Sequence, residues 1–176
     1  MEIRVIADDI TKVKADAVIV NHFEGVDKLD GDISAVDKAL GGAISQLVSQ
    51  GEIKGKLNEV TIVHSLGKLP ADRVVVAGLG KPADLTVNKI RGAVAETCRQ
   101  LRQKGVATIA TSPLGAGINN ISPESSAQAI AEGALLGLYA FRKHITREEN
   151  KFGEIKQLLI VGSARIKSAL EGGSHK

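Results

Sequence analysis

The sequence is poor in aromatic residues and has no strong charge bias. Of its 176 residues, three are Phe, one is Tyr and none is Trp, which leaves few side chains on which nucleic-acid bases could stack. Its 23 basic residues only slightly outnumber its 20 acidic ones, and they are scattered rather than clustered. These shortages make nucleic acid a poor candidate for a partner.

Cysteine and metal-ligand patterns are equally scarce. Cys98 is the single cysteine, which rules out an internal disulfide and a cysteine-based metal site. The histidines fall on separate expected elements, without the spacing of a helical metal pair: His22, His64, His144 and His175. We therefore expect no metal ligands in this chain, and no pattern identifies a nucleophile or another catalytic residue.

Long hydrophobic runs are missing too. No apolar stretch approaches the roughly 20 residues that cross a bilayer, and Met1 leads directly into an expected strand rather than into a charged and then apolar leader. Hydrophobic residues make up 43% and charged residues 24% of the chain, which is typical of a globular protein. The expectation is a single cytoplasmic domain with no membrane contact.

The stretch Val106–Lys143 is the best-defined part of the sequence. Val106–Thr111 is short, apolar and β-branched, which predicts a buried strand. Ser122 and Pro123 suit the start of a helix, whose apolar stripe is Ala127, Ile130, Ala131, Ala134, Leu135, Leu138 and Phe141. The loop between them, residues 112–120, carries two glycines. It is either a plain turn or an anion site at the carboxyl end of a strand.

The remaining elements alternate along the chain. Strands are expected at Ile3–Ala7, Ala17–Val20, Glu59–Ser65, Arg73–Leu79 and Lys156–Val161. Helices are expected over residues 32–50, with a break at Gly41-Gly42, and over 86–104, 122–143 and 164–170.

Only about seven residues separate the strands at 59–65 and 73–79, too few for a helical crossover. This predicts an α/β fold, a three-layer α/β/α sandwich with a mixed sheet of about six strands. It should occupy residues 1–170, with 171–176 as a disordered tail or a cloning remnant. Val75, Ile109 and Leu138 should be fully buried.

Two further motifs can be explained by local structure alone. Gly78-Leu-Gly-Lys81 lacks the spacing and the following Ser or Thr of a phosphate-binding loop, so we interpret it as a turn. Asp8 and Asp9 form a close carboxylate pair, which either orients a ligand or simply ends a strand.

Four segments resemble one family by their order and spacing: Asp37–Gly42, Gly51–Lys56, Arg73–Lys81 and Ala129–Phe141. They are similar to the N-terminal domain of the leucyl (cytosol) aminopeptidase family, peptidase family M17. The resemblance implies a cytoplasmic, hexameric metallo-aminopeptidase with two divalent ions, Zn or Mn, in a separate catalytic domain. That catalytic half, with its NTDAEGRL motif, is not in this sequence. We therefore expect either a fragment, whose partner is its own catalytic domain, or a stand-alone relative.

The domain also resembles macro domains, which bind ADP-ribose. Asp9-Ile-Thr11 and Asp16-Ala-Val-Ile-Val-Asn21 look like two macro-domain motifs, and Ser112–Ile118 looks like the loop whose amides wrap the diphosphate. The resemblance implies that Asp9 holds the adenine and that Asn21 lies in the same pocket. The residues implied for the loop are Gly115, Ala116, Gly117 and Ile118.

The sequence departs from the macro-domain pattern at three places. Glu24 stands where a second Asn is usual, Gly162-Ser163 where an aromatic residue is usual, and Asp30-Gly31-Asp32 where a glycine-rich loop is usual. Three hypotheses result. The first is a non-catalytic aminopeptidase domain with a structural and assembly role. The second is a module that binds ADP-ribose or a related nucleotide diphosphate, and the third is a hydrolase of ADP-ribosyl groups that acts through Asn21.

Overall fold

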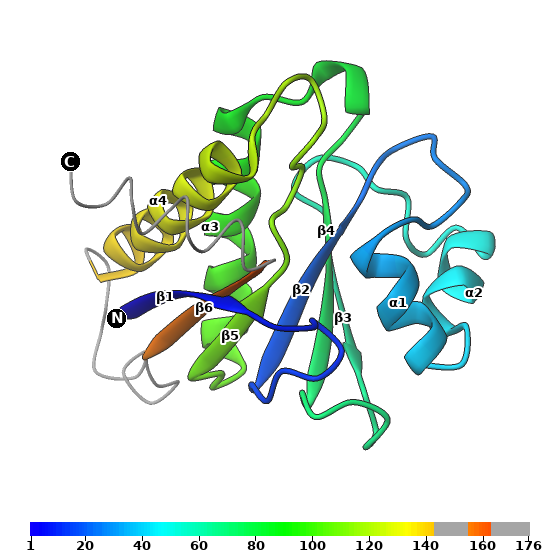
Figure 1. Ribbon diagram of the computed structural model, residues 1–176, viewed down its shortest axis with the longest axis horizontal. Coiled ribbons are helices and arrows are strands. Elements are labelled where there is room, and N and C mark those ends of the chain that lie inside the picture. The colour runs from blue at the N-terminus through cyan, green and yellow to red at the C-terminus, as the bar shows by residue number, and fades with distance from the viewer. Residues whose placement is uncertain (143–154, 163–176) are drawn as a thin grey trace.

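A six-stranded sheet separates two layers of helices (Figure 1). The structure, a computed structural model, describes residues 1–142 and 155–162, with side chains to residue 137 in the first range. The strands are β1 (Glu2–Ala7), β2 (Ala17–His22), β3 (Val60–His64), β4 (Arg73–Gly78), β5 (Thr108–Thr111) and β6 (Gln157–Gly162). Their order is β1-β6-β5-β2-β4-β3, and only β3 runs antiparallel to its neighbour. The predicted mixed sheet and α/β/α class are confirmed.

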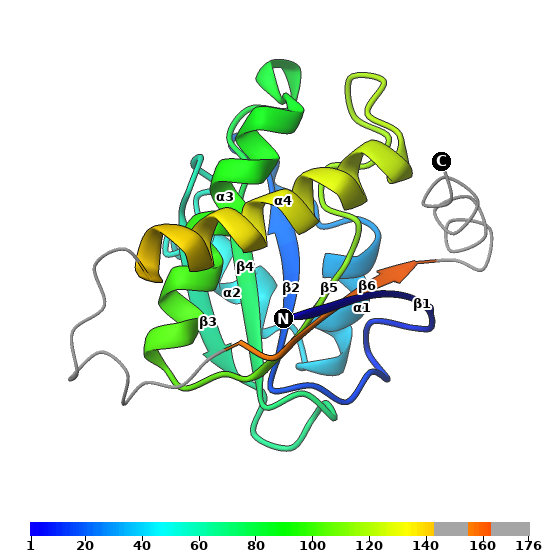
Figure 2. The ribbon, with the colours of Figure 1, turned by 90° about the vertical axis from the view of Figure 1, so that its left-hand side faces the viewer.

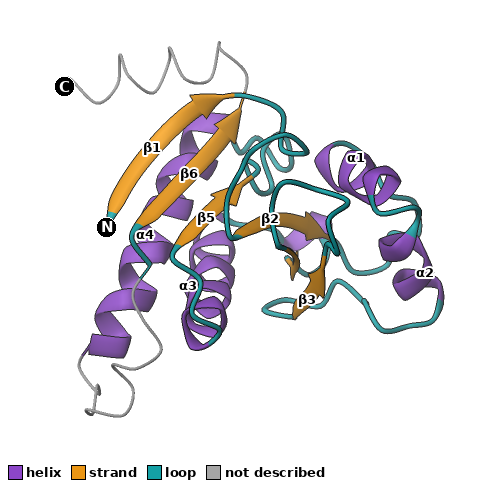
Figure 3. Cartoon of the chain, turned by 90° about the horizontal axis from the view of Figure 1, so that it is seen from below, coloured by secondary structure: helices purple, strands orange, loops and turns teal. Residues whose placement is uncertain are grey.

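The helices divide between the two faces of the sheet (Figure 3). One face is covered by α1 (Asp32–Ala39) and α2 (Ala43–Ser49), the other by α3 (Val87–Gln103) and α4 (Pro123–Arg142), and a 3-10 turn, η1 (Pro82–Asp84), precedes α3. None of the helices in the described part of the chain is long and apolar enough to cross a membrane. The helix expected over residues 164–170 and the tail expected at 171–176 lie outside the described residues.

Asp16 fixes the pairing at the centre of the sheet. Its carboxylate accepts hydrogen bonds from the backbone N–H groups of Ala107 and Thr108, both at 2.9 Å. Its own N–H donates to the Thr108 carbonyl, and its carbonyl accepts from the Arg73 N–H. Since the start of β2 is thus tied to β4 and β5 at once, the carboxyl ends of these strands are set relative to one another.

The predicted break between the first two helices is confirmed. Gly42, with φ of 86°, separates α1 from α2, a backbone conformation that glycine adopts without steric cost. The buried carboxylate of Asp37 accepts from the Ser45 N–H at 2.9 Å and from the Ser45 hydroxyl at 2.5 Å. A side chain of α1 therefore satisfies one backbone N–H group and one hydroxyl group at the start of α2.

Each face of the sheet buries its own apolar core. Val75 and Ile109 are fully buried, as predicted, whereas the Leu138 side chain lies outside the described residues. The expectation that Leu135 faces the core is wrong, because its side chain is 50% exposed. The physical reason is that α4 turns its glycine-bearing face inward, and position 135 lies about 200° around the helix from position 133.

Glycines let α4 lie across α3 in near-backbone contact (Figure 2). A Cβ at Gly133 would stand 2.4 Å from the Arg91 carbonyl oxygen, and one at Gly137 would stand 2.8 Å from the Ala95 carbonyl oxygen. Both distances are below any normal van der Waals contact. The two helices therefore approach more closely than any residue with a Cβ would allow.

This contact is tested by a matched pair of glycine substitutions. Gly133→Ala should lower the free energy of unfolding by about 1–3 kcal/mol, because the new methyl group forces the helices apart. Gly92→Ala, on α3, meets nothing within 4 Å and should raise stability by about 0.5–1 kcal/mol through helix propensity. Urea denaturation measures both, and shifts of the same sign would contradict the packing described.

Candidate functional site

A cavity of about 520 Å³ opens where β2 and β5 end. The chain leaves β2 toward α1 on one face of the sheet and leaves β5 toward α4 on the other (Figure 1). This reversal between adjacent parallel strands is a topological switch point, where open α/β sheets bind ligands. The volume also falls within the about 300–1,000 Å³ of small-molecule sites.

The cavity is lined by the end of β2, the segment before α1, and the loop after β5. The lining residues are Asn21, His22, Phe23, Val26, Lys28, Leu29, Asp30, Gly31, Asp32, Ile33, Pro82, Ser112, Pro113, Gly115, Ala116 and Ile118. Of the predicted ligand residues, Asn21, Gly115, Ala116 and Ile118 are therefore brought together. Asp9 and Gly117 are not in the lining.

Three polar residues lie at the strand ends. His22 and Ser112 are 4% and 3% exposed, and Asn21 is half-buried beside them. Within the part of the chain that the structure describes, neither the Asn21 carboxamide nor the Ser112 hydroxyl makes a side-chain hydrogen bond. Neither side chain is among the buried polar atoms left without a partner, so both groups keep contact with solvent and are available to a ligand in the cavity.

The loop after β5 is closed on itself by its own backbone amides. The Ala116 N–H donates to the Pro113 carbonyl at 3.2 Å, the Gly117 N–H to the Ile121 carbonyl at 2.8 Å, and the Ile118 N–H to the Gly115 carbonyl at 3.2 Å. Three of the four amides assigned to a diphosphate are therefore already used inside the loop.

Gly115 anchors this loop against the helical layer. Its φ of 71° is in the left-handed region, and a Cβ there would meet the Leu85 Cδ2 atom at 2.7 Å. Only glycine satisfies both conditions without rearrangement. The Asn119 side chain adds a hydrogen bond to the Pro82 carbonyl at 2.6 Å, and the Ser126 hydroxyl donates to the Leu114 carbonyl at 2.6 Å.

Carboxylates gather near the mouth of the cavity. Asp30 and Asp32 line it, and the pKa of Asp32 is raised, first by its burial and then by the negative charge of Asp9. Asp9 itself accepts from the Thr11 N–H at 2.9 Å and the Thr11 hydroxyl at 2.7 Å. These bonds hold the pKa of Asp9 below its usual value. Lys28 is the exposed basic side chain in the lining.

Sequence reasoning missed four lining residues, which fall between the strand expected to end at Val20 and the helix expected to begin at residue 32: His22, Phe23, Val26 and Leu29. β2 continues to His22 because Asn21 and His22 still pair with Ala77 and Gly78 of β4. The apolar residues among charged ones in this segment were the signal that could have marked a cavity wall.

The segment before β3 packs against the backbone of Phe23, which lines the cavity. The Glu59 carboxylate accepts from the Lys54 and Gly55 N–H groups, at 2.9 and 3.0 Å. A Cβ at Gly55 would stand 2.4 Å from the Phe23 carbonyl carbon, so this backbone passes directly against the loop after β2. The glycine-containing Gly51–Lys56 segment of the sequence thus has a packing role.

The order and direction of the strands and the two helical layers define a macro-type α/β/α fold. The Trypanosoma brucei macrodomain in complex with ADP shares this fold, with a TM-score of 0.71 at 15% identity, over 97% of this chain and 68% of that one. The family model of the cytosol aminopeptidase family, N-terminal domain, matches residues 19–146. The chain belongs to this family.

Relatives agree with that assignment. A probable cytosol aminopeptidase of Alkaliphilus oremlandii is 32% identical over 174 residues, which cover 98% of this chain and 35% of the relative. A tomato leucine aminopeptidase mutant superposes with a TM-score of 0.67 at 20% identity, over 99% of this chain and 36% of that one. The chain therefore spans about a third of the length of the curated relatives it matches.

His22 makes the stability of the domain depend on pH. Burial lowers the pKa of His22, partly offset by Glu59, the Val26 backbone and Asp27. The unfolded chain therefore binds this proton at a higher pH, near 6.5, than the folded chain does, so stability falls as the pH drops below about 6.5. Between pH 7.5 and 5.5, denaturation of His22→Gln should show a shallower loss of stability than the parent chain. Curves of equal slope for His22→Gln and the parent chain would refute the assignment.

Proposed function

We propose that this chain is a non-catalytic domain of a cytosol aminopeptidase, with a role in structure and assembly rather than in peptide hydrolysis. The observation that carries the proposal concerns the side chains that could bind a metal ion. Within residues 1–142 and 155–162, no three His, Cys, Asp or Glu side chains come together as metal ligands. These residues do not fit the two divalent ions, Zn or Mn, that the family implies, and in this proposal the ions would be held by the catalytic domain of the longer relatives.

The partners that follow from this proposal are the catalytic domain and further copies of the same protein. Relatives about three times as long support the first partner. Their name, cytosol aminopeptidase, supports a cytoplasmic location. The exposed side chains of Leu135 and Leu136, each 50% exposed on α4, are compatible with contacts beyond this domain.

The proposal predicts the absence of peptidase activity. The purified chain with added Mn²⁺ or Zn²⁺ should release no p-nitroaniline from leucine p-nitroanilide above the buffer background, because its described residues form no metal site that could activate water. The full-length Alkaliphilus oremlandii protein serves as the control for the assay. Turnover that co-purifies with this chain and disappears with EDTA would refute the proposal.

A second candidate function is the binding of ADP-ribose or a related nucleotide diphosphate. The cavity at the switch point supports it, as does the fold shared with a macrodomain in complex with ADP. The side chains of Asn21 and Ser112, which make no hydrogen bond to another described residue, support it further. In this proposal Asp9, Asn21 and residues 115–118 form the ligand site. The loop amides must then exchange their internal hydrogen bonds for bonds to the ligand.

Calorimetric titration of ADP-ribose tests this candidate. Saturable heat is expected with the parent chain, and Asn21→Ala should weaken binding about tenfold, the effect of one lost hydrogen bond. Asn88→Ala makes the same chemical change at an exposed position outside the cavity lining and should bind as the parent does. Titration to millimolar ligand without heat would remove binding as a function.

A further inference from the structure

The cavity offers hydrogen-bond partners but few groups that hold a phosphate. Phosphate sites in proteins use backbone N–H groups, helix N-termini or cationic side chains. Here the N–H groups of Ala116, Gly117 and Ile118 donate inside their own loop, at 2.8–3.2 Å. Three of the four loop amides that could bind a phosphate are therefore occupied.

The other two sources of positive potential are also weak. The N-terminus of α1 begins at Asp32, whose carboxylate stands in the first helical turn and compensates the helix dipole at that end. The buried imidazole of His22 stays neutral near neutral pH, because burial lowers its pKa. Asp30 and Asp32 both line the cavity and repel a dianion, with only the exposed Lys28 opposing them.

The polar groups that line the cavity suit a ligand other than a phosphate. The Ser112 hydroxyl, on a residue 3% exposed, and the half-buried Asn21 carboxamide have no side-chain partner among the described residues. A hydroxyl and a carboxamide each donate and accept, while carboxylates accept from ligand hydroxyl and amino groups. The walls between these groups are apolar, with Phe23 and Ile118 among the lining residues.

We propose that the cavity takes a phosphate-free ligand rich in hydrogen-bond donors, of the chemical class of a nucleoside, in preference to a nucleoside diphosphate. Asn21 and Ser112 bind its polar edge, the apolar walls cover its ring, and Asp30 and Asp32 accept from its hydroxyl or amino groups. This inference rests on the proposed use of the cavity as a binding site and reverses the charge preference of its ligand.

The test compares adenosine, ADP and ADP-ribose by calorimetry at pH 7.5. The parent chain should bind adenosine at least as tightly as ADP or ADP-ribose. The double variant Asp30→Asn/Asp32→Asn should bind ADP about tenfold more tightly, because two repelling charges are gone, and adenosine about tenfold more weakly, because charged acceptors are lost. Asp32→Asn alone should move both affinities in the same directions, so the comparison stands if the double variant does not fold.

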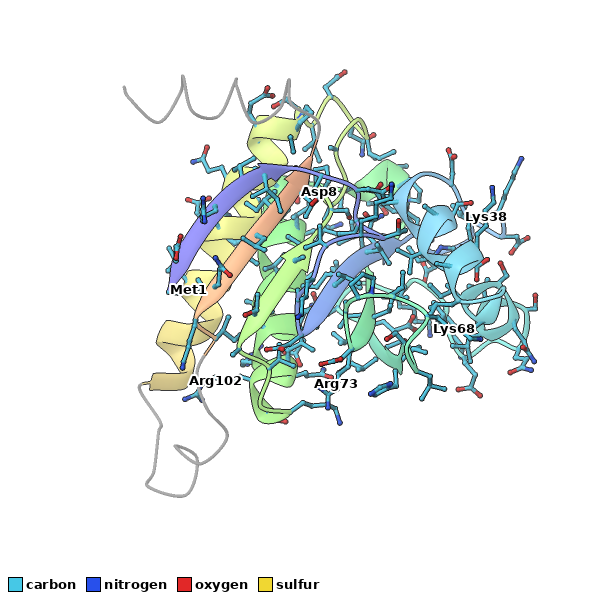
Figure 4. The ribbon with its side chains drawn as sticks, turned by 60° about the horizontal axis from the view of Figure 1, so that its bottom comes forward. Met1, Asp8, Lys38, Lys68, Arg73 and Arg102 are labelled. Atoms are coloured by element: carbon cyan, nitrogen blue, oxygen red, sulfur yellow. The ribbon has the colours of Figure 1, made fainter. Side chains whose placement is uncertain are left out.

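A matched variant controls for net charge. Glu2→Gln/Asp72→Asn removes the same charge at the amino ends of the strands, at the edge of the sheet opposite the cavity. Figure 4 shows the separation of these edges, with Asp8 after β1 at one end and Arg73 at the start of β4 at the other. This variant should keep the affinities of the parent chain.

The outcomes separate the inference from the proposal beneath it. ADP or ADP-ribose bound more tightly than adenosine by the parent chain, with no gain in Asp30→Asn/Asp32→Asn, would overturn the inference and leave the cavity as a diphosphate site. A parallel gain in the Glu2→Gln/Asp72→Asn control would also overturn it, because net charge alone would then explain the change. No heat from any ligand at millimolar concentration would overturn both the binding function and the inference.

Discussion

The carboxylate of Asp16 is the contact on which the arrangement of the site depends. It binds the Ala107 and Thr108 N–H groups and so holds the start of β5 in register with β2. Because parallel strands in register end together, Asn21 and Ser112 arrive at the same edge of the sheet. The connections then leave to opposite faces, and a cavity remains between them.

Close backbone approaches determine the shape of the rest of the domain. Gly55 admits the segment before β3 against the Phe23 carbonyl, and Gly133 admits α4 against the Arg91 carbonyl. At these contacts one backbone segment packs directly against another, without interdigitated side chains between them. Glycine makes these approaches possible because it has no Cβ atom.

Sharing a fold with a macrodomain does not mean that this cavity suits the same ligand. The chain has the macrodomain architecture, at 15% identity to the Trypanosoma brucei protein in complex with ADP, but its cavity mouth is acidic and its loop amides are engaged. Fold alone does not determine the ligand, because the residues on the loops change the electrostatics while the strands keep the cavity in place. The chain belongs to the cytosol aminopeptidase family and spans about a third of the length of its curated relatives.

The sequence by itself determined the strands, the break at Gly41-Gly42 and the mixed sheet, because local periodicity and short connections depend only on neighbouring residues. It also predicted that Asn21 and the loop after β5 lie together at the carboxyl ends of the strands. The tertiary structure alone decided that Leu135 faces solvent, since the inward face of α4 follows from its glycine contact with α3. It likewise decided that His22 and Phe23 line the cavity and that the loop amides bond to one another. Those outcomes depend on contacts between segments far apart in the chain, which no local pattern specifies.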